Sequence, residues 1–71
     1  MAIADLVRMA NQIAANFGHL PEGEAAAEVA THLRLYWTPR MRSQLINFED
    51  GGDGGLSPVA HAAVARLRTL A

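Results

Sequence analysis

Three prolines divide this sequence into segments, and each stands at a place where a helix can begin. Pro39 follows Thr38 and Pro58 follows Ser57, so a side chain that can accept a backbone N–H precedes a ring suited to the first turn of a helix. Pro21 likewise fits the first turn of a helix. Because proline is disfavoured inside helices and central strands, this spacing predicts several short helices.

Apolar residues recur at steps of three and four within each segment, which is the period of an amphipathic helix. The pattern predicts an all-α fold: one helical domain, residues 1–71, that forms a small bundle of about four short helices at about 2–17, 22–36, 39–48 and 58–70. The residues predicted to face the core are Ile3, Leu6, Ala10, Ile13, Phe17, Ala26, Val29, Leu33, Tyr36, Met41, Leu45, Phe48, Val59, Ala63, Leu67 and Leu70. No segment shows the alternation of a strand.

Glycines mark two of the connections. Gly18 stands where a left-handed cap would end the first helix. The stretch Gly51–Gly55 precedes the last helix and is expected to be a flexible connector. It is not expected to bind phosphate, because no strand precedes it, no lysine follows it, and Asp50 and Asp53 would repel an anion.

Composition argues against catalysis and metal binding. The chain has no cysteine, which excludes a disulfide, a thiolate zinc site and a cysteine-ligated iron–sulfur cluster. None of the three histidines has a histidine or cysteine at the spacing of a helical metal site. We expect no catalytic, cofactor-binding or metal-binding residue here. A core of this size supplies roughly 3 to 5 kcal/mol, so a partner chain is the obvious stabiliser.

Charge argues against polyanionic partners. The formal net charge is −1, so no general field holds a nucleic acid or an anionic membrane. No apolar run approaches the length of about 20 residues that spans a bilayer. The first residues carry Asp5 and Arg8 in an amphipathic repeat, unlike a signal peptide. We expect a soluble, cytoplasmic protein that binds neither nucleic acid nor membrane.

The stretch Arg34–Arg42 has the most unusual composition. It contains Tyr36, Trp37 and three of the six arginines of the chain, around a predicted bend. Tryptophan, tyrosine and arginine are enriched at protein interfaces. In a small bundle, however, the two aromatic rings are equally suited to the core, with the arginines as a solvated rim. Composition leaves both interpretations open.

Four motifs along the chain carry a more specific resemblance. They are Leu-Val-Arg-Met-Ala-Asn-Gln-Ile at 6–13, His-Leu at 32–33, Trp-Thr-Pro-Arg-Met-Arg at 37–42 and Gly-Gly-Leu-Ser-Pro at 54–58. In this order they resemble the delta subunit of NAD-dependent, molybdenum-containing formate dehydrogenase, over essentially the whole chain. The resemblance implies a non-catalytic accessory subunit of a cytoplasmic complex, which docks on the catalytic alpha subunit and supports its assembly or stability.

The resemblance also implies where the cofactors and the interface lie. Molybdenum cofactor, iron–sulfur clusters, FMN and NAD are expected in partner subunits, which oxidise formate to CO2 and reduce NAD. The partner interface is expected at Arg8, Asn11, Gln12, His32, Trp37, Pro39, Arg40 and Arg42. The arginines would pair with partner carboxylates, Asn11 and Gln12 would bond partner backbone, and Trp37 would fill a pocket. Pro39 would fix the turn.

Two other functions stay open at this stage. In one, the chain is a homo-oligomeric adaptor in which the apolar faces of the first and last helices close a bundle between copies. In the other, it is a regulatory or DNA-binding helical module that lays Arg34, Arg40 and Arg42 on phosphates. The acids of the second helix and the loop weigh against DNA.

Overall fold

The computed structural model describes residues 2–52 and 54–70, and of Leu70 the backbone only. The helices are α1 (Ile3–Asn16), α2 (Glu22–Tyr36), α3 (Pro39–Asp50) and α4 (Pro58–Leu70). Within the described ranges there is no strand, so the prediction of a small all-α bundle is confirmed. The proposed core position of Leu70 and the expected role of Asp53 lie outside the described residues.

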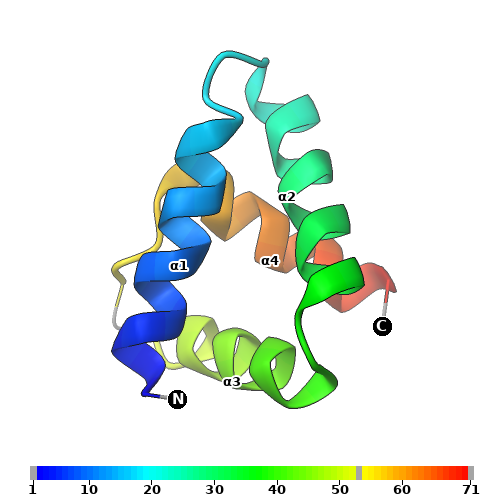
Figure 1. The fold of residues 1–71 in the computed structure, drawn as a ribbon. Coiled ribbons are helices and arrows are strands. Elements are labelled where there is room, and N and C mark those ends of the chain that lie inside the picture. The colour runs from blue at the N-terminus through cyan, green and yellow to red at the C-terminus, as the bar shows by residue number, and fades with distance from the viewer. Residues whose placement is uncertain (1, 53, 71) are drawn as a thin grey trace.

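The helices enclose one core (Figure 1). Helices α1 and α2 diverge from the short turn at residues 17–21, and α3 runs across their far ends (Figure 1). Helix α4 lies behind this frame and packs mainly against α2, with further contacts to α1 and α3. In the described part of the chain, no helix has the length and apolar character needed to cross a membrane.

Small residues dominate the core, so a few large side chains carry much of its packing. Each helix contributes to the buried cluster, which consists of Leu6, Ala10, Ala14, Val29, Ala30, Leu33, Trp37, Leu45, Ala60, Ala63, Val64 and Leu67. The largest fully buried side chains belong to Leu6, Leu33 and Leu45, followed by two valines. Alanines let the helices approach closely but bury little area each, so the loss of one large side chain removes much of the apolar contact.

Most predicted core positions are confirmed, with exceptions at the helix ends. Ile13, Phe17, Met41 and Val59 are partly buried and pack against the core. Ile3 is 38% exposed and Tyr36 is 72% exposed, although both belong to the predicted stripes. Each is a terminal residue of its helix, beyond the point where a neighbouring helix covers the apolar face. Phe48 is half-buried.

The predicted caps at the two Ser/Thr-Pro pairs are confirmed. The Thr38 hydroxyl accepts a hydrogen bond from the Met41 amide at 3.2 Å. The Ser57 hydroxyl accepts one from the Ala60 amide at 3.3 Å. Pro21 lies one position earlier than predicted, as the N-cap of α2 rather than in its first turn.

The predicted left-handed cap at Gly18 was wrong, and α3 ends slightly later than its approximate predicted bound. Gly18 is not left-handed, because the positive-φ glycines of the described residues are at 52, 54 and 55. Helix α1 ends in a tight turn instead, where the Gly18 amide donates to the Ala15 carbonyl at 3.1 Å. Helix α3 continues beyond residue 48 to Asp50. Its last residues bond to α4, where Glu49 contacts the His61 ring and Asp50 forms an ion pair with Arg68, and these contacts favour the extra helical length.

Candidate partner-binding surface

The chain turns sharply between α2 and α3, at Trp37 and Thr38. Trp37 has extended backbone angles and ends α2, while Thr38 caps α3. The Trp37 side chain is only 5% exposed and belongs to the core cluster. Of the two interpretations left open by composition, the core position is therefore the one that Trp37 adopts. Its predicted contact with a partner remains a prediction.

Arg42 holds this turn together. One guanidinium nitrogen, Nη1, donates to the Arg34 carbonyl at 3.0 Å and to the Trp37 carbonyl at 2.6 Å. These carbonyls lie at the C-terminal end of α2, where a cation interacts favourably with the helix dipole. Arg42 therefore serves its own chain as a cap on α2. The family resemblance assigned this side chain to a partner carboxylate and did not indicate the capping role.

Replacing Arg42 by alanine is expected to lower the free energy of unfolding by about 1 to 2 kcal/mol, because two carbonyls lose a charged donor at a half-buried site. Arg40→Ala is the matched control, since Arg40 is exposed. It should change stability by less than about 0.5 kcal/mol. Urea denaturation followed by circular dichroism measures both, and equal stabilities would show that the cap contributes nothing.

Two large apolar residues lie exposed beside the turn. Leu35 is 68% exposed and Tyr36 is 72% exposed. The Tyr36 ring stacks on the ring of His32, with centroids 4.8 Å apart and the planes tilted by 50°. Arg34 precedes Leu35 and Tyr36 in the sequence and Arg40 follows them, and both arginines are exposed. We call the residues His32, Arg34, Leu35, Tyr36 and Arg40 the corner surface.

Asn11 holds α1 to the segment that precedes α4. Its Nδ2 donates to the Gly55 carbonyl at 2.7 Å, and its Oδ1 accepts from the Ser57 amide at 2.8 Å. Gly55 has φ +107 and Gly54 has φ +77, values that other residues rarely adopt. The side chain predicted to bond a partner thus bonds its own backbone. The Gly-Gly-Leu-Ser-Pro motif is the other half of this contact, a pairing across 44 to 46 residues that no local pattern reveals.

The remaining predicted interface residues are spread over the helices. Arg8 is exposed and pairs with Asp5 one turn earlier, at 3.1 Å. Gln12 is exposed on α1, and Pro39 is exposed at the first position of α3. Among the described residues, one side-chain hydrogen bond joins two members of the predicted set, from Arg42 to the Trp37 carbonyl. The exposed pair Leu35 and Tyr36 was not in that set.

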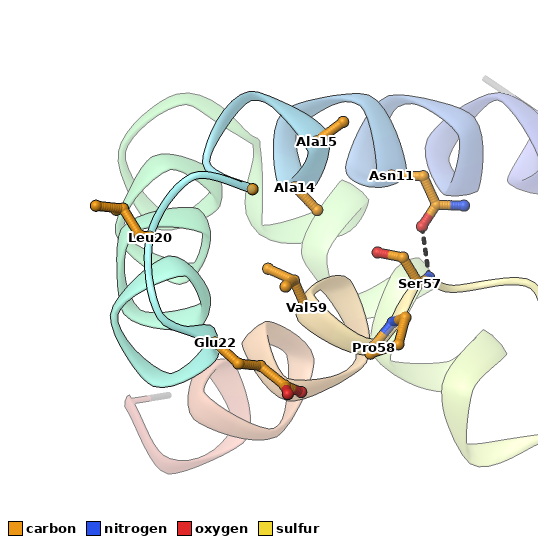
Figure 2. A pocket seen from close by; sticks show the side chains of 9 residues that line it. Asn11, Ala14, Ala15, Leu20, Glu22, Ser57, Pro58 and Val59 are labelled. Atoms are coloured by element: carbon orange, nitrogen blue, oxygen red, sulfur yellow. Dashed lines mark hydrogen bonds between the residues drawn. The ribbon is translucent and has the colours of Figure 1, made fainter.

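A shallow groove opens between the end of α1, the turn at 17–21 and the start of α4 (Figure 2). Its volume is about 370 Å³, and its lining is formed by Asn11, Ala14, Ala15, Gly18, Leu20, Glu22, Ser57, Pro58 and Val59. Glu22 is the titratable residue of this lining, and the Ser57 hydroxyl is bonded to the Ala60 amide. Among the described residues, no hydrogen bond joins the Ser57 hydroxyl to the Glu22 carboxylate, so the groove lacks the bonded nucleophile and base that nucleophilic catalysis uses. Within the described ranges, no group of three or more acids or histidines could hold a metal ion.

One comparison with known proteins gives a match. A family model described as NADH-dependant formate dehydrogenase delta subunit FdsD matches residues 5–64. No curated protein and no solved structure matches the chain. The matched range includes the corner surface, the Arg42 cap and both sides of the Asn11 contact.

Proposed function

Because the chain belongs to the delta subunit family of NADH-dependent formate dehydrogenases, we propose that it is a non-catalytic accessory subunit of such a complex. It docks on the catalytic alpha subunit and supports the assembly or stability of the enzyme. Molybdenum cofactor, iron–sulfur clusters, FMN and NAD belong to the other subunits in this proposal. The lack of cysteine in the chain supports that division, since cluster ligation needs thiolates.

The exposure of Leu35 and Tyr36 is the structural observation that carries the docking proposal. Full burial of one such side chain is worth about 1.5 to 3 kcal/mol, and this small core leaves two of them in solvent. Large exposed apolar groups rimmed by polar residues are typical of protein interaction sites. Tyrosine is also among the residues that contribute most to binding energy. A partner that covers this pair would gain affinity and stabilise the chain.

The homo-oligomeric alternative has less support from the fold. It needed the apolar faces of the first and last helices to be free for another copy. Those faces are buried within one chain, as Leu6 and Ala10 on α1 and Ala63 and Leu67 on α4 show. The larger apolar exposure lies at the end of α2 instead.

The proposal is tested by affinity purification of the tagged chain from cells that also make the formate dehydrogenase subunits. Mass spectrometry should identify the large molybdenum-binding subunit at roughly equal stoichiometry with the chain. Recovery of copies of the chain alone would contradict the proposal and favour a homo-oligomer. Recovery of neither a subunit nor a second copy would contradict both.

A double variant, Leu35→Ser with Tyr36→Ser, should reduce recovery of the large subunit at least about tenfold. The loss of apolar contact exceeds the 1.4 kcal/mol that corresponds to a factor of ten. Both residues are exposed, so the variant should unfold at nearly the same temperature as the parent. Ala4→Ser with Asn16→Ser is the control, because both positions are exposed on α1 and neither belongs to the predicted interface. Equal recovery of all three chains would show that docking occurs elsewhere.

A further inference from the structure

We propose that the corner surface binds an acidic segment of the alpha subunit, one that presents clustered carboxylates beside an apolar pocket. This inference rests on the proposed function and specifies the chemistry of its partner. In this inference, the arginines that contact the carboxylates of the partner are Arg40 and Arg34. Arg8 is already paired with Asp5, and Arg42 is bonded to the end of α2.

Arg40 is placed against the local preference of its helix. It lies in the first turn of α3, where the helix dipole disfavours a cation by about 0.3 to 1 kcal/mol. That turn contains no acid that would offset it. Arg40 is exposed, and the ion pairs found among the described residues involve other side chains. A local rule broken without compensation inside the chain indicates a functional contact.

The surrounding charges add to the same field. Between Glu28 and Glu49 the sequence contains no acidic residue, whereas it contains three arginines. The Arg42 cap folds the start of α3 back onto the end of α2, which keeps these cations at one corner. Exposed charges act on one another over about 10 Å at moderate salt, so cations on adjoining helix ends add to one field. Guanidinium groups of this kind bind carboxylates through two parallel hydrogen bonds.

The neighbouring residues favour a protein over a nucleic acid. Leu35 and Tyr36 supply apolar area that a phosphate backbone cannot cover. Glu22, Glu24 and Glu28 are exposed along α2 and would repel a polyanion. Helix α2 thus carries acids toward its start and Arg34 in its last turn. This separation of charge along α2 would orient the chain on its partner, with the corner surface facing the acidic segment.

Charge reversal at Arg40 tests the inference without threatening the fold. Arg40→Glu puts an acid into the first turn of α3, which the helix dipole favours, so lost binding does not come from unfolding. Affinity for the purified alpha subunit should fall at least about tenfold at about 50 mM salt, and the difference should shrink at about 300 mM because salt screens the pair. Arg66→Glu, exposed on α4, makes the same charge change and should bind within about twofold of the parent.

Photo-cross-linking identifies the chemistry of the partner directly. A benzoyl-phenylalanine residue placed at position 36 in the assembled complex should capture an acidic peptide of the alpha subunit. Capture of a neutral or basic peptide, or equal binding by Arg40→Glu, would overturn the inference and leave the accessory role intact. Failure of the parent chain to bind any subunit would instead contradict the proposed function. Binding of the parent to a short DNA duplex in place of the subunit would overturn both.

Discussion

Alanine in place of Trp37 is expected to lower the free energy of unfolding by about 3 to 5 kcal/mol. The side chain is 5% exposed and lies in a core whose other members are mostly small. Little nearby can move to fill the space, so the cavity adds to the lost burial. A core of this size supplies roughly 3 to 5 kcal/mol in total. The isolated variant should therefore be largely unfolded at room temperature.

Tyr36→Ala is the matched control, because it removes an adjacent aromatic ring that is 72% exposed. Its free energy of unfolding should stay within about 0.5 kcal/mol of the parent. Far-ultraviolet circular dichroism at increasing urea concentration measures both variants. A Trp37→Ala chain as stable as the control would contradict the core position of this side chain.

This prediction changes how binding experiments at the bend are interpreted. If the Trp37→Ala chain fails to purify with the alpha subunit, unfolding explains the failure as well as a lost contact does. The Tyr36→Ala chain stays folded, so a loss of binding there reports on the surface itself. Variants of these two neighbouring aromatic residues thus distinguish a role in the core from a role in partner binding, which composition alone could not do.

Alanine in place of Asn11 is expected to lower the free energy of unfolding by about 1 to 3 kcal/mol. The change removes the donor to the Gly55 carbonyl and the acceptor from the half-buried Ser57 amide. The cost includes the desolvation of a backbone group that loses its partner. Gly54 and Gly55, which have positive φ, then lose this restraint, and the segment before α4 loses both hydrogen bonds to Asn11.

Hydrogen exchange gives this prediction a local measurement. The Ser57 amide should exchange much faster in Asn11→Ala than in the parent, while amides in the middle of α2 should change only as global stability changes. Gln12→Ala, the exposed neighbour on α1, should leave the Ser57 amide as protected as in the parent. Unchanged protection of Ser57 in Asn11→Ala would show that the contact does not hold the loop.

The sequence directed attention to the stretch Arg34–Arg42, but only the structure shows which of its residues are exposed. The bend at Trp37 and Thr38 and the family resemblance both pointed to the stretch that includes Arg40. The division of labour within that stretch was not predictable, because neighbours in sequence differ in burial according to where the helix ends. Tyr36 is the last residue of α2 and faces solvent, whereas Trp37 follows it and turns into the core.

What the sequence determined by itself is local. Proline positions, Ser/Thr caps and apolar periodicity act over a few residues, so they specified the helices and the starts of α3 and α4. The tertiary structure alone decided the Asn11 contact with residues 55 and 57, the Arg42 cap on α2 and the extra length of α3. Each of these features depends on groups from separate elements that come into contact only after the helices have packed. The spacing of residues in the sequence does not indicate such contacts.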